Sequence, residues 1–241
     1  MEDSPRRVPL SHRRSLVARH TRLRPIEGVE GIRLHLADDL DATWRATEEA
    51  QGIEGAPIPF WAFAWAGGLA LARYMQEHPD LVAGRNVLDF ATGSGLVAIA
   101  AARAGAAHVT ASDIDPFAEA AVGMNARANG VHVSFVRRDL LDEPAPDVDV
   151  LLAADTWYEG PLADRVLPWL REASASGIRV ILGDPGRKYL PAAGLAEAGF
   201  VEAARYEVRT TTTLEDREFV LSRVFTLSAV APDTMGDTPP A

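Results

Sequence analysis

The amino-acid sequence predicts an α/β protein whose core is a mostly parallel β-sheet with helices on both faces. From Arg85 onward, strand-like apolar runs alternate with helix-like segments, and this alternation is typical of parallel strands joined by crossover helices. The last segment, residues 200–228, departs from this rhythm because two strand-like runs follow one another without a clear helix between them. Those two runs predict an antiparallel hairpin at one edge of the sheet.

The individual strands and helices of residues 85–228 follow from their residue patterns. Pro116 falls where the first turn of a helix favours proline, and Asp115 precedes it as a predicted N-cap. Short runs rich in Val, Ile and Leu predict strands, at 86–90, 107–112, 131–139, 148–154 and 178–184. Longer runs with apolar residues at helical spacing predict helices, at 95–105, 116–130, 161–174 and 190–199.

Residues 1–84 are predicted to form an N-terminal extension that has structure of its own and packs on the main domain, 85–228. Alternating apolar residues predict one short strand, and two periodic runs predict helices on either side of a turn-rich aromatic stretch. Gly52 ends the first of these helices. The segments are the strand 31–37, the helix 39–52, the aromatic stretch 55–68 and the helix 69–78.

Length and composition exclude several classes of protein. With 241 residues the chain can bury the core of one large domain or of two small ones. The absence of Cys excludes disulfides, a thiolate nucleophile and a Cys-ligated metal. No apolar run reaches the roughly 18 residues that a membrane span needs. The net charge of −10 disfavours DNA or RNA and favours a basic partner, although the same charge also promotes solubility.

Charge is distributed unevenly along the chain. Residues 1–25 hold seven Arg against two acidic residues, a composition that resembles a transit peptide and would direct the protein to the mitochondrial matrix. Leu16, Val17 and Leu23 lie near helical spacing and favour a docked helix instead, which agrees with a cytoplasmic protein. Residues 229–241 are poor in hydrophobic residues and rich in turn residues, so we expect a disordered tail.

A glycine-containing loop, within "VLDFATGSGLVAIAA", joins the first strand of the main domain to its helix. Asp89 lies at the carboxyl end of the strand, while Gly93 and Gly95 permit a tight turn into a helix whose N-terminus offers unpaired N–H groups. The loop could be a plain strand-to-helix turn. It also fits the dinucleotide-binding fingerprint, Gly93-x-Gly95-x-x-Ala98, with Asp113 about 20 residues further on.

Two features favour S-adenosylmethionine over a dinucleotide as the ligand of this loop. Asp89 would repel a pyrophosphate but attract the ammonium group of a methionine moiety, and the edge hairpin suits the seven-stranded sheet of methyltransferases. Asp113 ends the second strand, where it can accept hydrogen bonds from both ribose hydroxyls. Asp139 ends the third strand, where it could bind the adenine amino group or lie as a solvated carboxylate beside Arg138.

A family resemblance rests on five segments, "PFWAFAWAGGLALARYM", "VLDFATGSGLVAIAAA", "DIDPFAEAA", "DTWYEGPLADRVLPWL" and "ILGDPGR". They resemble the lysine methyltransferases that modify the beta subunit of electron transfer flavoprotein, which carry an Asp/Glu-x-x-Tyr/Phe signature after the fourth strand. The likeness runs from about Arg19 to Leu227. It implies a Rossmann-like seven-stranded mixed sheet, S-adenosylmethionine as the cofactor without a metal, and methylation of lysines of that beta subunit. With the charge and the lack of a long apolar run, we also expect a monomer that binds neither nucleic acid nor membrane.

The resemblance also implies a role for each residue around the cofactor. Trp65 should pack on the cofactor, with a place in an aromatic core as the alternative, while Asp89 should face the methionine end and Asp113 the ribose. Ala154 should line the wall beside the sulfonium. Many relatives have glycine at the position of Ala91, where alanine costs little if its φ is negative. The loop residues that should wrap the cofactor are Ala91, Thr92, Gly93 and Gly95.

The run "VDVLLAADTWYEG" begins as a buried strand and ends in a carboxylate and two large aromatic residues. Ligands of a parallel sheet bind beyond the carboxyl ends of its strands, and Asp155 falls at such an end. We expect Asp155 to accept a hydrogen bond from the incoming lysine amine, and Trp157 and Tyr158 to wall the channel of the cationic side chain. An ordinary solvated loop explains one polar residue well but two exposed large aromatics poorly.

Two other functions are compatible with the sequence. The same fold and cofactor could methylate a small amine, such as a pyridine-type metabolite, and turnover would then need no protein acceptor. A non-catalytic nucleotide-binding module would bind NAD or S-adenosylmethionine without methyl transfer. The carboxylates of Asp89 and Asp155 favour an enzyme over such a module.

Overall fold

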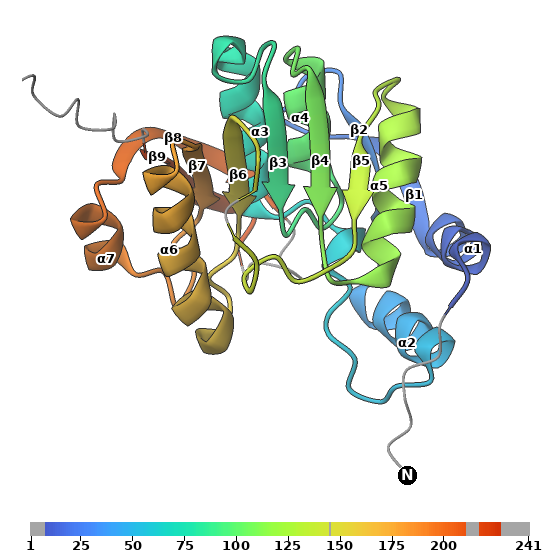
Figure 1. The fold of residues 1–241 in the computed structure, drawn as a ribbon. Coiled ribbons are helices and arrows are strands. Elements are labelled where there is room, and N and C mark those ends of the chain that lie inside the picture. Colours follow the sequence, from blue (N-terminus) through green and yellow to red (C-terminus); the bar gives the residue numbers. More distant parts are fainter. Residues whose placement is uncertain (1–7, 145, 211–216, 228–241) are drawn as a thin grey trace, which may run out of the picture.

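A seven-stranded mixed sheet forms the core of the protein, whose computed structural model describes residues 8–144, 146–210 and 217–227. Its strands are β3 (Asn86–Phe90), β4 (His108–Ser112), β5 (Ser134–Val136), β6 (Val150–Ala154), β7 (Arg179–Asp184), β8 (Val201–Arg209) and β9 (Phe219–Leu227). They lie in the order β5-β4-β3-β6-β7-β9-β8 (Figure 1). The first five in this order are parallel, and β9 runs antiparallel to both β7 and β8. The predicted sheet and its edge hairpin are confirmed.

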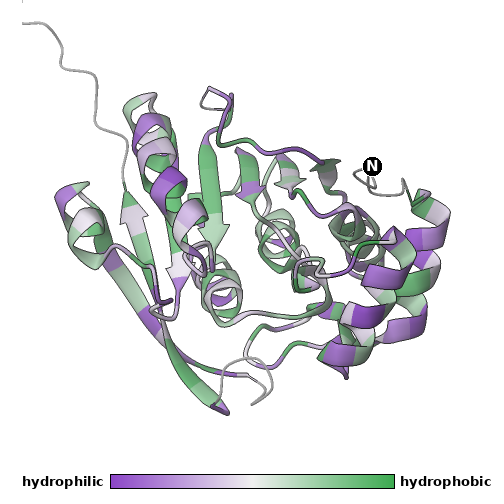
Figure 2. Ribbon diagram, turned by 90° about the horizontal axis from the view of Figure 1, so that it is seen from below, coloured by the Kyte–Doolittle hydropathy of each residue, from purple (hydrophilic) through white to green (hydrophobic). Residues whose placement is uncertain are grey.

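The central strands are buried on both faces, and their side chains alternate between two hydrophobic clusters. Val87 and Leu152 belong to the cluster on one face, whereas Leu88 and Leu151 belong to the cluster on the other. Figure 2 shows these strands in hydrophobic colours, with the hydrophilic residues gathered on the surrounding helices. Burial of both faces explains why the strands read as continuous apolar runs in the sequence.

Helices cover both faces of the sheet, as the alternation of segments predicted. Residues of α6 and α7 line one cluster, and residues of α4 and α5 line the other. Asp115 caps α5 as expected, because its Oδ1 accepts from the N–H of Phe117 at 2.7 Å. These helices are α4 (Leu96–Arg103), α5 (Pro116–Ala128), α6 (Gly160–Ala175) and α7 (Ala192–Glu197).

The third strand is shorter than the sequence predicted. A strand was expected over 131–139, but β5 spans only Ser134–Val136 and pairs only with β4. β5 is the edge of the sheet, and the next three residues, 137–139, are charged and exposed. Beyond Val136, hydration of these charged side chains is more favourable than continued pairing of the backbone at the edge of the sheet.

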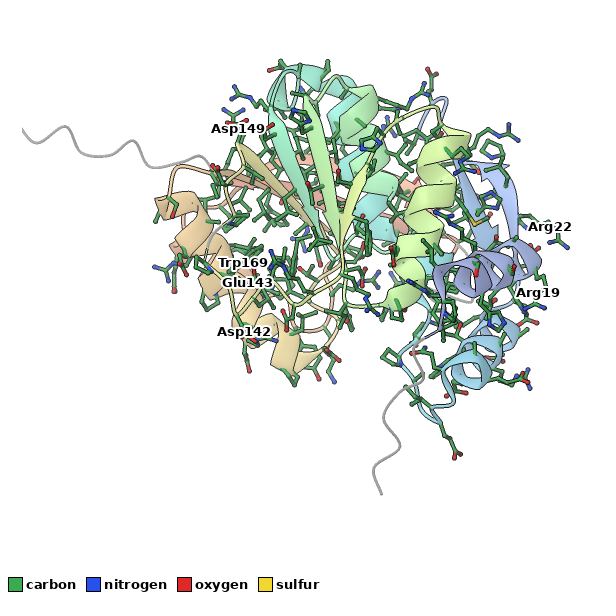
Figure 3. The ribbon with its side chains drawn as sticks, turned by 45° about the vertical axis from the view of Figure 1, so that its right-hand side comes forward. Arg19, Arg22, Asp142, Glu143, Asp149 and Trp169 are labelled. Carbon is green, nitrogen blue, oxygen red and sulfur yellow. The ribbon has the colours of Figure 1, made fainter. Side chains whose placement is uncertain are left out.

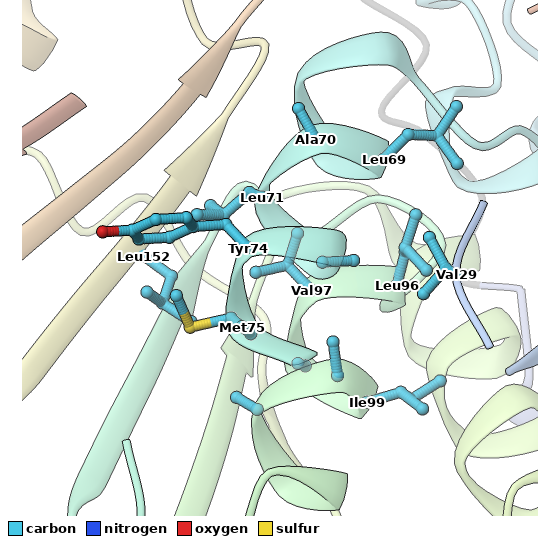
Figure 4. Packing of buried hydrophobic residues seen from close by; sticks show 14 of the residues in the cluster. Val29, Leu69, Ala70, Leu71, Tyr74, Met75, Leu96, Val97, Ile99 and Leu152 are labelled. Carbon is cyan, nitrogen blue, oxygen red and sulfur yellow. The ribbon is translucent and has the colours of Figure 1, made fainter. Parts of the chain in front are cut away.

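A helix from the N-terminal part of the chain completes one face of the core. This helix, α3 (Ala66–Glu77), packs on β7 and β9 and against α4. Figure 4 shows Leu71 and Met75 of α3 beside Val97 of α4 and Leu152 of β6. Residues that precede Arg85 therefore share the hydrophobic core of the main domain.

The remaining N-terminal elements form a small layer beside α5. They are α1 (Leu10–His20), β1 (Thr21–Pro25), β2 (Arg33–Ala37), α2 (Leu40–Gln51) and the short 3₁₀ turns η1 (Phe60–Ala62) and η2 (Pro79–Leu81). α1 docks on α5, and Arg13 Nη1 lies 2.7 Å from Glu119 Oε2. Arg19 and Arg22 point away from this contact, toward solvent (Figure 3).

The expectation of one helix that includes Leu23 is wrong. α1 ends at His20, and Thr21–Pro25 forms β1, which pairs antiparallel with β2. The Thr21 hydroxyl donates to the Val17 carbonyl at 2.6 Å and closes the last turn of α1. The backbone of Leu23 gains ladder partners in β2 that a helix would not provide.

No helix among residues 8–144, 146–210 and 217–227 has the length and apolar character that crossing a membrane requires. The tail that was expected to be disordered, 229–241, lies outside the described residues.

Candidate active site

The loops that follow β3, β4 and β6 meet at the carboxyl edge of the sheet. In Figure 1 the arrowheads of β3, β4 and β5 all point to this edge. The turn η1 lies over it, because a Cβ on Gly93 would be 3.4 Å from the Phe60 carbonyl oxygen. The ring centroids of Phe60 and Tyr158 are 4.7 Å apart. Phe60 therefore joins the glycine loop to the segment that follows β6.

Asp89 anchors the glycine loop to α4. Its Oδ2 accepts from the Thr92 hydroxyl and from the Ala98 N–H, the latter at 2.9 Å. The residue is only 1% exposed, and burial raises the pKa of its carboxyl to about 7, against the lowering effect of these two hydrogen bonds. The expected contact of Asp89 with a methionine ammonium group stays a prediction.

Ala91 adopts a left-handed backbone conformation, so the condition under which alanine would cost little, a negative φ, is not met. Its φ is 53°, close to the values of 52° at Gly93 and 82° at Gly95. The N–H of Thr92 donates to the Ser112 carbonyl at 3.0 Å, which pulls the chain across to β4 directly after β3. That crossing requires a turn for which glycine is the unstrained residue.

Asp113 and Tyr158 follow β4 and β6, the two strands that flank β3. Asp113 accepts from the Gly93 N–H and from the Asp115 N–H, both at 2.9 Å, and burial raises the pKa of its carboxyl. Burial, then Glu159, and then Asp113 raise the pKa of the Tyr158 phenol to about 12. Tyr158 is 39% exposed, and the negative charge of Asp113 acts on it. The ribose contact of Asp113 stays a prediction.

Asp139 lies apart from these carboxylates. It is exposed, accepts from the Leu141 N–H at 3.0 Å and lies 2.9 Å from Arg165 of α6. Arg165 also binds Asp142, which Figure 3 shows beside α6. The description of Asp139 as a solvated carboxylate fits this placement, with Arg165 rather than Arg138 as its partner. Its contact with an adenine stays a prediction.

Asp155 is held on both sides at the end of β6. Its Oδ2 accepts from the Gly68 N–H at the start of α3, at 2.9 Å. Its Oδ1 accepts from Arg187 Nε at 3.0 Å and from Arg187 Nη2 at 2.7 Å. Burial raises the pKa of the Asp155 carboxyl, although Arg187 and the N–H groups of α3 oppose the rise. A φ of 55° turns the chain out of the strand here, and Asp tolerates that conformation better than most residues.

Trp157 packs in the core, so the expectation of two exposed aromatics after β6 is wrong. Its side chain is 0% exposed and lies in the cluster that also holds Val166 and Trp169 of α6. Its Nε1 has no hydrogen-bond partner among the described residues. The turn into α6 directs Trp157 beneath that helix and leaves Tyr158 to face outward. Trp157 therefore does not line an open channel in this structure.

Trp65 joins the side of the site that contains Asp155. Its Nε1 donates to the Phe60 carbonyl at 3.1 Å, and the guanidinium carbon of Arg187 lies 5.5 Å from its ring centroid. Its contact with a cofactor stays a prediction, as does that of Ala154, the last residue of β6.

No pattern in the sequence indicated a role for Arg187 or Phe60. Both belong to segments that carried the family resemblance, "ILGDPGR" and "PFWAFAWAGG". The motif was therefore a usable signal for Arg187. Its pairing with Asp155, 32 residues away, depends on the packing of two loops that no local pattern describes.

These residues fit a ligand with a cationic end and a diol. Asp89, which is buried, and Asp113, which is partly buried, place two carboxyl groups at adjacent strand ends, and a side chain on Gly95 would be crowded, since its Cβ would lie 3.1 Å from Val122 Cγ2. Backbone N–H groups at the start of α4 face the same loop. S-adenosylmethionine has both features in its methionine and ribose moieties. The described residues contain no group of three or more acidic or His side chains that could hold a metal ion.

The order of strands and the position of this site define the fold of class I S-adenosylmethionine-dependent methyltransferases. A model of the family "Ribosomal protein L11 methyltransferase (PrmA)" matches residues 70–154. A ribosomal protein L11 methylase from Lactobacillus delbrueckii subsp. bulgaricus is 25% identical with a TM-score of 0.50, over 68% of this chain and 79% of that chain. A putative RNA methyltransferase from Pyrococcus horikoshii has the same fold, with 16% identity and a TM-score of 0.55 over 74% and 90% of the two chains.

The chain belongs to the family of the electron transfer flavoprotein beta subunit lysine methyltransferases. The protein of that name from Xenopus laevis is 35% identical over 185 residues, which are 76% of this chain and 74% of that protein. The one from Rattus norvegicus is 40% identical over 131 residues, 54% of this chain and 51% of that protein. The match therefore spans only about half the length of the rat relative.

Proposed function

We propose that this protein transfers methyl groups from S-adenosylmethionine to lysine side chains of the beta subunit of an electron transfer flavoprotein. The observation that carries the proposal is the position of Asp155. Its carboxylate lies at the end of β6, with Trp65, Arg187 and the start of α3 around it, at the edge that also holds Asp89 and Asp113. The names of the relatives supply the substrate.

In this proposal the residues at the ends of β3 and β4 bind the cofactor. Asp89 attracts its ammonium group, Asp113 accepts from its ribose, and the loop of Ala91, Thr92, Gly93 and Gly95 follows its surface. When bound, S-adenosylmethionine supplies a methyl group on a positively charged sulfur that already reacts with amines. The protein therefore needs to align the reacting atoms and exclude water, and alignment of this kind can lower a barrier by about 7–11 kcal/mol.

The residues after β6 prepare the acceptor. A lysine amine has a free pKa of about 10.4 and must lose its proton before it can attack. The rings of Phe60 and Tyr158 cover the site and lower that pKa by excluding water. Asp155 opposes this effect because a carboxylate stabilises ammonium. Its main role is therefore to orient the amine, and proton acceptance comes second.

The same proposal covers the setting in which the protein works. It acts in the cytoplasm as a monomer, and it binds neither nucleic acid nor membrane. The net charge of −10 supports a basic protein partner over a polyanion. No metal takes part, because the sulfonium needs no further activation.

The test is methyl transfer to a defined acceptor. The purified protein is incubated with radiolabelled S-adenosylmethionine and the purified flavoprotein, and mass spectrometry then identifies the labelled residues. We expect label on lysines of the beta subunit, and labelling about 100-fold slower with Asp155→Asn. Label confined to small molecules of a lysate would replace the proposal by small-amine methylation. Cofactor binding without any transfer would replace it by a non-catalytic module.

A further inference from the structure

Both oxygens of the Asp155 carboxylate already have their hydrogen bonds in this structure. A carboxylate offers about four acceptor positions, two on each oxygen. Oδ2 accepts from the Gly68 N–H, and Gly67 packs against the same oxygen, since a Cβ on Gly67 would lie 2.6 Å from it. Oδ1 accepts from both Nε and Nη2 of Arg187. A lysine amine can therefore reach Asp155 only if one of these donors leaves.

The backbone donor of α3, the Gly68 N–H, cannot move away from Asp155. A Cβ on Gly67 would overlap the carbonyl oxygen of Gly183, so helix and strand are in direct backbone contact at this point. Leu69, Leu71 and Met75 bury the next two turns of α3 in the core. Withdrawal of the Gly68 N–H would require α3 to separate from the sheet.

The guanidinium of Arg187 is the donor that can move. It stands at the end of a long side chain that is 16% exposed. The backbone beneath it is fixed, because Asp184 Oδ1 accepts from the Gly186 N–H at 2.6 Å and from the Arg187 N–H at 2.8 Å. Rotation about the bonds of the side chain can therefore move the cation away while the backbone of the loop stays in place.

The place that the guanidinium occupies suits a lysine ammonium equally well. It has a carboxylate, Asp155, on one side and the ring of Trp65 on the other, with the guanidinium carbon 5.5 Å from the ring centroid. Aromatic faces and carboxylates bind both kinds of cation. We propose, on the basis of the function proposed above, that Arg187 occupies the acceptor-lysine site of the free enzyme and is exchanged for the substrate lysine.

Exchange of one cation for another keeps the buried carboxylate compensated until the bound amine loses its proton. An Asp155 without a cation would be a nearly buried, unpaired charge, which is strongly unfavourable. A neutral side chain that entered the site would have to displace the guanidinium without replacing its charge. Arg187 is thus a positioning residue that also selects for cationic acceptors.

The first measurement is the effect of Arg187→Ala on the kinetics with the flavoprotein at pH 8. Because the competing cation is gone, we expect the acceptor KM to fall by about tenfold, while the KM for S-adenosylmethionine stays the same. Methylguanidinium chloride should then compete with the acceptor in the variant and restore the KM of the parent protein, which it should leave unaffected. An unchanged acceptor KM with a lower kcat that methylguanidinium restores would overturn the proposal, since Arg187 would then be needed during transfer.

The second measurement uses no turnover and no protein acceptor. Calorimetry with n-butylammonium chloride, a mimic of the lysine side chain, should detect binding to Arg187→Ala but not to the parent protein or to the double variant that also carries Asp155→Asn. Thermal unfolding and cofactor binding establish that the variants are folded, and Arg187→Met, which keeps an unbranched side chain in place of the arginine stem, serves as a second uncharged variant. Equal binding to the parent protein and to both uncharged variants would refute the exchange. This result is independent of whether the flavoprotein is the substrate.

Discussion

Gly67 of α3 and Gly183 of β7 lie backbone against backbone. A methyl group on Gly67 would overlap the Gly183 carbonyl oxygen and would come within 2.6 Å of Asp155 Oδ2, and one on Gly183 would overlap the Gly67 carbonyl oxygen. Because neither residue has a side chain, the start of α3 reaches Asp155 and donates the Gly68 N–H to it. The pair of glycines thus fixes the carboxylate that the proposed function depends on.

Substitution of Gly67 by alanine should separate α3 from β7. We expect Gly67→Ala to lower the free energy of unfolding by about 1–3 kcal/mol, the usual cost of overpacking, and to impair methyl transfer by moving Asp155. Gly68→Ala is the matched control, since its Cβ would meet Val97 Cγ2 at 3.8 Å, an ordinary contact. It should raise the free energy of unfolding by about 0.5–1 kcal/mol, because alanine favours a helix. Urea unfolding measures both, and equal effects of the two substitutions would contradict the close approach.

Glycine should be the better residue at position 91. The φ of 53° at Ala91 costs an L-residue roughly 1–2 kcal/mol, and glycine relieves this strain. Part of the relief is offset because glycine has the greater conformational entropy in the unfolded chain. Ala91→Gly should therefore stabilise the protein by about 0.5–1 kcal/mol. Ala46→Gly in α2 should destabilise it by a similar amount, about 0.5–1 kcal/mol. Thermal and urea unfolding distinguish the two, and a loss of stability in Ala91→Gly would show that the left-handed turn is not strained.

The stability of the protein should fall as pH rises from about 4 to 7. Burial raises the pKa of Asp89 to about 7 in the folded protein, whereas an unfolded Asp titrates near 3.9. Between these values the folded state keeps a proton that the unfolded state has lost, so rising pH favours unfolding until the folded carboxyl also ionises. For this carboxyl group alone, the free energy of unfolding should decrease by on the order of 4 kcal/mol over this pH range.

The variant Asp89→Asn isolates that contribution. Asn can still accept from the Ala98 N–H but does not titrate, so its free energy of unfolding should change less with pH over this range. Burial also raises the pKa values of Asp115 and Asp184 to about 7. The free energy of unfolding of both proteins therefore still depends on pH to some extent. Urea titrations at several pH values give the difference, and parallel curves for the two proteins would exclude a protonated Asp89 in the folded state.

Loss of the charge on Asp155 should slow turnover strongly without loss of cofactor binding. Asn at this position keeps an acceptor for the Gly68 N–H but holds neither Arg187 nor the incoming amine in place. We expect Asp155→Asn to reduce the single-turnover rate by about 100-fold and to leave the Kd for S-adenosylmethionine within a few-fold. Asp142→Asn, whose side chain is 80% exposed beside α6, should change neither quantity. A parallel loss of cofactor affinity would place Asp155 in the cofactor site instead.

The position of the candidate site could be predicted from the sequence because it depends on where strands end. Asp89, Asp113 and Asp155 each follow an apolar run, and the rule that ligands bind beyond such ends places them at one edge. The direction of individual side chains could not be predicted in the same way. Trp157 and Tyr158 lie in an irregular turn without periodicity, so nothing local indicates that Trp157 enters the core while Tyr158 faces outward.

The sequence by itself determined the elements, the two-sided burial of the central strands and the chemical types of the residues at their ends. These properties depend on periodicity, caps and turn residues, which act over a few positions. Only the tertiary structure decided that Asp155 is bound by Arg187 and by α3, that Ala91 takes a left-handed turn, and that Gly67 meets Gly183. These features depend on contacts between segments that are far apart in the chain, and such contacts arise from the packing of whole elements against one another.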